Sequence, residues 1–226
     1  MSLLEAVRIT KSYPEGDGIL NVLKGVDLQI KERETIAITG ESGCGKSTLL
    51  HLLGLLDSPD SGDIVYKGAK VAFNQKRVAE FRNRNIGFIF QFHYLLDDFT
   101  VVENIAIPMF ISSGNWTKSR GEAKKLLERI NLKQRSKYYP NQLSGGEQQR
   151  VAILRALINK PEIILADEPT GNLDPKNSEE VISLMSELND EAGCSLVIVT
   201  HNQEIADRMG KRYILKDGFL EDVSLS

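Results

Sequence analysis

The stretch ETIAITGESGCGKSTLLHLLGLL, residues 34–56, decides the fold. ETIAIT is an apolar run typical of a buried strand, and KSTLLHLLGLL has the length and composition of a helix. Between them lie Gly40, Gly45, Lys46 and Ser47, in the spacing G-x-x-x-x-G-K-[S/T]. Glycines at these places let the backbone curl so that its N–H groups face a phosphate. The stretch therefore predicts a strand, a phosphate-binding loop and a helix.

This loop predicts a site for a nucleoside triphosphate and magnesium. Lys46 is placed to reach the β- and γ-phosphates, and the hydroxyl of Ser47 is a ligand for Mg²⁺. We interpret Cys44 as a small filler residue, with a redox switch as the less favoured alternative. The residues expected to contact the nucleotide are Gly40, Glu41, Ser42, Gly43, Cys44, Gly45, Lys46, Ser47 and Thr48.

Two carboxylates follow a second apolar strand. IILADEP places Asp167 and Glu168 at the end of a buried run, where open α/β sheets bind their ligands. Neighbouring residues of a strand face opposite ways, so the two need not share a role. We expect Asp167 to bind Mg²⁺ through water, and Glu168 to polarise the water that attacks the γ-phosphate.

Two further polar residues stand at strand ends. Gln91 ends the run IGFIFQ, and its amide can touch both Mg²⁺ and the attacking water. His201 follows SLVIVT, and although a single histidine is more often structural, its place on the next strand favours contact with the γ-phosphate. The predicted catalytic residues are Lys46, Gln91, Glu168 and His201, and the predicted metal ligands are Ser47, Gln91 and Asp167.

The rest of the chain alternates strand and helix patterns. LEAVRITKSY and LKGVDLQI alternate as strands, and RYILKDGFLEDV is typical of a hairpin with an Asp-Gly turn. From about Phe92 the sequence is charged and helix-periodic, as in NWTKSRGEAKKLLERINL, and no strand pattern returns until EIILAD. The order predicts a mainly parallel α/β sheet with helices on both faces and an inserted helical segment.

Composition excludes several function classes. The net charge of −3 argues against nucleic-acid binding, and the two cysteines make no disulfide framework. The start of the chain lacks the apolar run of a signal peptide, and the longest aliphatic block is too short to span a bilayer. We expect a cytoplasmic protein, and if it serves a membrane, another polypeptide must do the spanning.

A second glycine-rich helix start lies at LSGGEQQR, residues 143–150. Ser144, Gly145 and Gly146 could bind an anion there, although a complete phosphate loop already exists. A metabolic kinase with a phosphate-binding loop is excluded by this motif.

Six motifs in order resemble the nucleotide-binding subunit of an ATP-binding cassette (ABC) transporter: GESGCGKST, Gln91, LSGGEQQR, IILADE, GNLD and His201. The resemblance covers nearly the whole chain. It implies a P-loop NTPase (RecA-like) fold with an N-terminal antiparallel β subdomain. It also implies one ABC ATPase domain over residues 1–226, with a catalytic core at 1–91 and 151–226 and a helical subdomain at 92–150. Tyr13 then corresponds to the aromatic residue that stacks on adenine, against the alternative of an ordinary half-buried strand residue.

The resemblance also answers why two phosphate sites exist. In the family two subunits pair head to tail, and each ATP, with its Mg²⁺, lies between the P-loop of one and the signature of the other. It implies that Ser144, Gly145 and Gly146 contact the partner's ATP, and that Asp174 bridges the two sites. Glu147 stands where Gln is more common, which we expect to leave binding intact. Asn202 stands where Asp is usual, which we expect to soften the local hydrogen bonds.

One branch of the family fits best. FIFQFHYLLDDFTVVENIAIPMF and LADEPTGNLD resemble the ATPase subunits of bacterial lipoprotein-releasing systems. The resemblance implies a homodimer at the cytoplasmic face of the inner membrane, bound to two integral membrane permease subunits and no nucleic acid. It would power release of lipoproteins toward the outer membrane. Macrolide or peptide efflux ATPases and FtsE-type cell-division ATPases of the same branch remain alternatives.

Five apolar residues follow Gln91 and have two possible roles. They form either a groove for a short helix of the membrane subunit or ordinary packing within the protein, and the sequence leaves both open. We predict permease contact through this region, residues 92–99. The five residues are Phe92, Tyr94, Leu95, Leu96 and Phe99.

Overall fold

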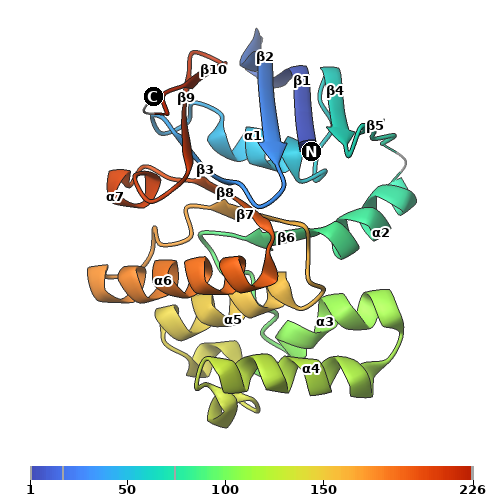
Figure 1. The fold of residues 1–226 in the computed structure, drawn as a ribbon, viewed down its shortest axis with the longest axis vertical. Helices are drawn as coiled ribbons and strands as arrows, with labels where there is room; N and C mark the ends of the chain where they lie inside the picture. Colours follow the sequence, from blue (N-terminus) through green and yellow to red (C-terminus); the bar gives the residue numbers. More distant parts are fainter. Residues whose placement is uncertain (1, 17, 74, 225–226) are drawn as a thin grey trace. The chain divides into compact units, whose positions relative to one another are not determined.

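The computed structural model describes residues 2–16, 18–73 and 75–224 (Figure 1). By their packing, the residues form two compact units, and each is described by itself. The first unit comprises Met1–Ala79, Leu165–Glu168 and Cys194–Ser226, and the second comprises Glu80–Ile164 and Pro169–Gly193. These units are defined by how the residues pack. The expected boundaries between core and helical subdomain, at 91/92 and 150/151, were drawn from the sequence, and they stay a prediction.

The first unit contains an antiparallel sheet in the order β2-β1-β4-β5. β1 and β2 pair along most of their length, as the alternating patterns near the N-terminus predict. Leu4 and Ala6 of β1 are buried two residues apart, as the alternation in the sequence predicts, and the pairing register shifts before the next buried residue, Ile9. The strands are β1 (Ser2–Glu15), β2 (Gly18–Lys31), β4 (Ser61–Tyr66) and β5 (Ala69–Lys70).

A second sheet of the first unit has the order β10-β9-β3-β8, continued by the end of β7. β3 runs parallel to both β8 and β9, and β10 turns back antiparallel to β9 through Asp217 and Gly218, which confirms the predicted hairpin. Every residue of β8 is buried, which explains its continuous apolar sequence. These strands are β3 (Thr35–Thr39), β8 (Ser195–Val199), β9 (Lys211–Lys216) and β10 (Phe219–Asp222).

Two helices complete the first unit. α1 (Lys46–Leu53) contacts both β1 and β8 and so joins the two sheets, and α7 (Gln203–Ala206) contacts β3. Because β3 and β8 are parallel, the loops that leave their carboxyl ends start at the same edge of the sheet. This edge carries the phosphate-binding loop and His201.

The second unit is mainly helical, which confirms the predicted helical insertion (Figure 1). α5 contacts α3, α4 and α6, and α3 and α4 pack side by side. α2 (Gln75–Asn85) and β7 (Ile163–Asp167) run through both units. The other elements are β6 (Ile86–Ile89), α3 (Val101–Ser113), α4 (Trp116–Arg129), η1 (Lys133–Arg135), η2 (Pro140–Gln142), α5 (Gly145–Leu157) and α6 (Pro175–Ala192).

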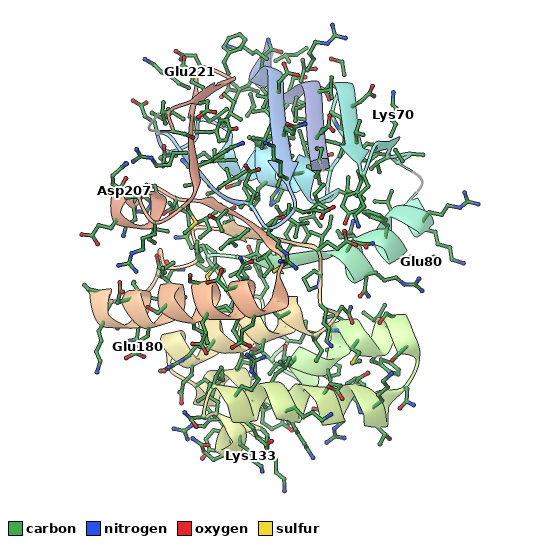
Figure 2. The ribbon with its side chains drawn as sticks, viewed as in Figure 1. Lys70, Glu80, Lys133, Glu180, Asp207 and Glu221 are labelled. Carbon is green, nitrogen blue, oxygen red and sulfur yellow. The ribbon has the colours of Figure 1, made fainter. Side chains whose placement is uncertain are left out.

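α6 is an amphipathic helix of 18 residues. Val181, Met185 and Leu188 are buried on one face, whereas acidic residues such as Glu180, which Figure 2 labels, are exposed. Among the described residues, no helix combines the length and the apolar composition needed to cross a lipid bilayer.

Candidate active site

The phosphate-binding loop connects β3 to α1. At two of its glycines, the side chain of any other residue would collide with neighbouring atoms. At Gly40 (φ +150°) a Cβ atom would lie 2.5 Å from the carbonyl oxygen of Leu215. At Gly45 (φ +105°) it would lie 2.5 Å from a methyl carbon of Val22. Gly45 precedes α1 without any side-chain cap, so the first N–H groups of the helix stay available to an anion.

Lys46 lies folded over this loop. Its side chain is largely buried, and Nζ donates to the carbonyl oxygens of Gly40 (2.9 Å) and Glu41 (2.7 Å). Both partners are backbone carbonyls rather than carboxylates, so they leave the positive charge of the ammonium group unneutralised. A charge held in this way suits an anionic ligand at the loop.

Ser47 and Asp167 bring two oxygen ligands together. Burial raises the pKa of Asp167, while a hydrogen bond with Ser47 opposes the rise. A hydroxyl and one carboxylate suit Mg²⁺, which usually takes its remaining oxygens from phosphates and water. In the described part of the chain, no group of three or more His, Cys, Asp or Glu residues could hold a metal alone. The donor chemistry of Ser47 and Asp167 thus fits a magnesium ion, and their binding of Mg²⁺ stays a prediction.

Glu168 lies just beyond β7 in a left-handed backbone conformation, with φ of +43°. Such a conformation costs about 1 kcal/mol or more for a residue other than glycine, and here the Glu168 N–H donates to the carbonyl of Val199 (2.9 Å). Its carboxylate accepts a bond from Thr200 Oγ1 (3.2 Å) and lies 2.9 Å from Nδ1 of His201. The two acidic residues therefore have separate partners. Asp167 is bonded to Ser47 of α1, and Glu168 contacts Thr200 and His201, which follow β8.

The residues that follow β8 hold this carboxylate in place. Thr200 is buried, its N–H donates to the carbonyl of Ile38 (3.2 Å), and its hydroxyl accepts from the N–H of Asn202 (3.0 Å). Asn202 in turn caps α7 by accepting from the N–H groups of Glu204 and Ile205. The imidazole of His201 is mostly exposed to solvent, so its Nε2 edge is open to a ligand.

Tyr13 lies in β1 and is tied to the loop after α1. Its ring is 37% exposed, and its hydroxyl donates to Asp57 Oδ2 (3.1 Å). Lys11 lies 2.8 Å from the same carboxylate oxygen and 5.3 Å from the centre of the Tyr13 ring. A partly exposed ring with a fixed hydroxyl is suited to stacking on a base, and this role stays a prediction.

Gln91 belongs to the second unit and lies two residues beyond β6, which ends at Ile89 rather than at Gln91 as expected. Gln91 Nε2 donates to Asn172 Oδ1 (3.4 Å), and Asn172 Nδ2 donates to the carbonyl of Gln91 (3.1 Å). A Cβ atom at Gly171 would lie 2.8 Å from Gln91 Nε2. Gln91 is thus joined to the GNLD segment, and its pairing with Ser47 and Asp167 at one metal stays a prediction.

The signature motif begins α5 with a complete capping box. Ser144 Oγ accepts from the N–H of Glu147 (3.3 Å), and Glu147 Oε2 accepts from the N–H of Ser144 (2.9 Å). The capping box does not bond the N–H groups of Gly145 and Gly146, and these groups also have no hydrogen-bond acceptor within the helix. These two groups and the Ser144 hydroxyl are what the motif can offer to an anion.

Glu147, the departure from the usual glutamine, has a structural explanation. The carboxylate completes the capping box and also accepts a bond from Arg135 Nε (3.0 Å). Although burial alone would raise its pKa, bonds from the Ser144 N–H and from Arg135 hold the pKa of Glu147 below its usual value. Arg135 offsets the negative charge that would otherwise repel a phosphate at this helix start.

Asp174 caps the start of α6 and belongs to the same cluster as the signature. Its carboxylate accepts from the N–H of Asn177 (3.0 Å), and this bond lowers the pKa of Asp174. A Cβ atom at Gly146 would overlap the side-chain amide of Asn177. Gly146 is therefore required for the close approach of α5 and the start of α6.

Comparison with known proteins places this geometry in a family. Residues 23–171 match the family model described as ABC transporter. The chain belongs to this family. It is an ATPase of the ABC type, as the motifs and the P-loop geometry predict.

Its relatives include two lipoprotein-releasing system ATP-binding proteins. LolD of Shewanella oneidensis is 49% identical over 220 residues, which cover 97% of this chain and 96% of that protein. LolD 2 of Chlorobaculum tepidum is 47% identical, covering 97% and 92% of the two chains. The predicted resemblance to this branch is confirmed.

Solved structures of the ATP-binding cassette MJ0796 have the same fold. A dimeric post-hydrolysis state of MJ0796 bound to ADP and Pi matches with a TM-score of 0.89 and 38% identity. The match covers 99% of this chain and 100% of that chain. The predicted P-loop NTPase fold class is confirmed.

Several residues of the site escaped the sequence analysis. Thr200 contacts the Glu168 carboxylate, Asp57 binds the hydroxyl of Tyr13, and Asn172 binds Gln91. Thr200 could have been suspected because it directly precedes His201 at a strand end. Asn172 lies within the GNLD motif, but nothing local indicates its bond to Gln91, 81 positions away. Asp57 carries no signal of its own, since it acts on a residue 44 positions away.

Proposed function

We propose that this chain is the ATPase subunit of a bacterial lipoprotein-releasing system. The observation that carries the proposal is 49% identity to an ATP-binding protein of such a system over 97% of the chain. The protein would act at the cytoplasmic face of the inner membrane, and its hydrolysis of ATP would drive lipoproteins toward the outer membrane.

Hydrolysis would use the residues at the carboxyl ends of β3, β7 and β8. The uncapped start of α1 and Lys46 would bind the phosphates, and Glu168 would take a proton from the attacking water. His201 would hydrogen-bond the γ-phosphate through the ring nitrogen that faces away from Glu168. Mg²⁺, when bound by Ser47, Asp167 and Gln91, would neutralise charge on the phosphates.

The signature would act on an ATP held by a second copy of the chain. Support comes from its capping box, which leaves too few free donors to hold a triphosphate alone. The MJ0796 cassette is dimeric in the structure bound to ADP and Pi. Two ATP molecules shared in this way would close the homodimer, and hydrolysis would open it, with Asp174 close to both sites.

Residues 92–99, the docking segment, would contact the two membrane permease subunits. Four of its five apolar side chains are exposed, which favours an interaction surface over internal packing. Their exposed fractions are 62% for Phe92, 63% for Tyr94, 47% for Leu96 and 38% for Phe99. A short amphipathic helix is the partner such a surface accepts.

The test is to co-express the chain with the two integral membrane subunits of a lipoprotein-releasing system from the same organism. We expect the three to copurify, and ATP hydrolysis in nanodiscs to rise when a lipidated protein is added, but not with a macrolide. Cells depleted of the chain should retain lipoproteins in the inner membrane. Filamentous cells with normally located lipoproteins would instead favour the division ATPases of this branch and contradict the proposal.

A further inference from the structure

The docking segment has no regular secondary structure, yet buried polar side chains hold its backbone. From α3, Asn104 is 1% exposed and bonds both the N–H (2.7 Å) and the carbonyl (3.0 Å) of Leu96. Just before the segment, Gln149 of α5 is fully buried and donates to the carbonyl of Phe90 (3.4 Å). The backbone is therefore bonded inward, and the aromatic side chains are left outside.

Arg155 makes the shortest of these bonds. Its guanidinium donates to the carbonyl oxygens of Tyr94 (2.6 Å) and His93 (2.7 Å). The side chain is partly buried, and burial lowers the pKa of Arg155 to about 10. In the part of the chain that the structure describes, Arg155 has no carboxylate partner, so these two carbonyls offset the loss of hydration.

Tyr94 itself adopts a costly backbone conformation. Its φ is +46°, in the left-handed region that bulky residues rarely occupy. Such a conformation persists only where the surroundings determine it strongly. The two bonds from Arg155 and an edge-on contact between the rings of Tyr94 and Phe90, 5.3 Å apart, contribute to that constraint.

The same helix carries the signature at its start. Arg155 lies ten residues after Gly145 in α5, so the two residues are about 15 Å apart along one helix. His93 adds a second link, because its ring has a hydrogen bond to the backbone of Gly145. One rigid helix thus joins the docking segment to Ser144, Gly145 and Gly146.

We propose that Arg155 is a positioning residue that fastens the docking segment to the signature helix, so that movement of the docked permease moves the signature. This route rests on the proposed function, because it needs a membrane partner on the docking segment. The guanidinium is the feature that matters, because it reaches the two carbonyls through two separate nitrogens held in one plane, whereas a lysine would have to reach both with a single nitrogen on a differently shaped side chain.

The experiment compares Arg155→Lys with Arg129→Lys, both in the complex with the membrane subunits and in the isolated chain. Arg129 pairs with Glu191 on the surface of the same unit and serves as the matched control. We expect Arg155→Lys to keep the ATPase rate of the isolated chain within about twofold. Its stimulation by lipoprotein in the complex should fall about tenfold, within the usual range of coupling between sites. Arg129→Lys should change neither rate.

A second measurement uses the wild-type protein and does not depend on how the variant folds. Amide hydrogen exchange is compared between the isolated chain and the nucleotide-free complex. We expect docking to change exchange at residues 144–148 as well as at 92–96. Protection confined to residues 92–96 would overturn the proposal.

The outcomes separate this inference from the proposed function. Wild-type stimulation together with equal stimulation of Arg155→Lys overturns the inference alone. An equal loss of basal and stimulated rates in Arg155→Lys also overturns it, because that pattern indicates a general defect. A wild-type chain that neither copurifies with the membrane subunits nor responds to lipoprotein overturns both.

Discussion

The two glycine-rich helix starts of this protein look alike in sequence and differ in structure. α1 begins at Gly45 with no side-chain cap, and the nearby cation Lys46 is bonded only to loop carbonyls. α5 begins at Ser144 with a reciprocal capping box and an arginine on the capping carboxylate. At the start of α1, no described side chain accepts hydrogen bonds from the first N–H groups, and no carboxylate of the described residues is bonded to the Lys46 ammonium group. At the start of α5, the Ser144 side chain already accepts a hydrogen bond from one of these N–H groups.

This difference teaches how one chain uses two anion sites. An uncapped helix start beside a free cation binds a triphosphate by itself. A capped start contributes only a few donors, so it adds to a site that is mostly built elsewhere. The contrast predicts that changes at the P-loop affect binding of ATP by one chain, and that changes at the signature affect only the assembled pair.

The largest effect should come from Glu168→Gln, which tests whether both helix starts meet on one ATP. Loss of the general base should lower the turnover rate by about 10²–10⁴-fold and trap an ATP-bound dimer. Phosphate release and size-exclusion chromatography with ATP measure the two effects. Glu221→Gln in β10 is the exposed control and should behave as wild type. A Glu168→Gln protein that stays monomeric in ATP counts against the assignment.

Lys46→Met tests the uncapped start. Removing the ammonium group while keeping the stem should weaken ATP binding by one chain by about 2–4 kcal/mol, or roughly 30- to 1000-fold. Titration calorimetry measures the dissociation constant. If affinity stays near the wild-type value, the free cation of the loop is not what binds the triphosphate.

Ser144→Arg tests the capped start. A bulky cation there should block pairing and lower turnover by about tenfold to a hundredfold, while ATP affinity of the single chain stays within about twofold. Sedimentation in the Glu168→Gln background reports the pairing. Full ATPase activity in the Ser144→Arg protein would refute the action of the signature on a partner's ATP.

The smallest effect concerns the cap itself and depends on pH. Glu147→Gln should lower the free energy of unfolding at pH 7 by about 1 kcal/mol, because the cap and the Arg135 pair weaken. The folded-state pKa of Glu147 is lowered, so its contribution is present above the unfolded pKa of about 4.3 and is lost as pH falls through the folded value. Urea unfolding at pH 7 and near pH 3 should show the difference between wild type and variant disappear in acid. A constant difference would exclude the charge of Glu147 as its source.

Prediction from sequence succeeded where local structure is encoded over a short stretch. The P-loop, the Asp167–Glu168 pair and the turn at Asp217 and Gly218 each follow from a few neighbouring residues with strict backbone demands. It missed α2, whose sequence QKRVAEFRNRN is highly charged and shows little apolar periodicity. The left-handed conformation of Glu168 was also missed, since tertiary contacts and not local preference maintain it.

The sequence by itself determined the family, most of the order of strands and helices and the strand–loop–helix form of the P-loop, because these depend on local spacing and periodicity. Tertiary structure alone decided which distant residues converge: Thr200 on Glu168, Asp57 on Tyr13 and Arg155 on the docking segment. Such contacts join residues 32 to 61 positions apart, and no local pattern records which ones folding will bring together.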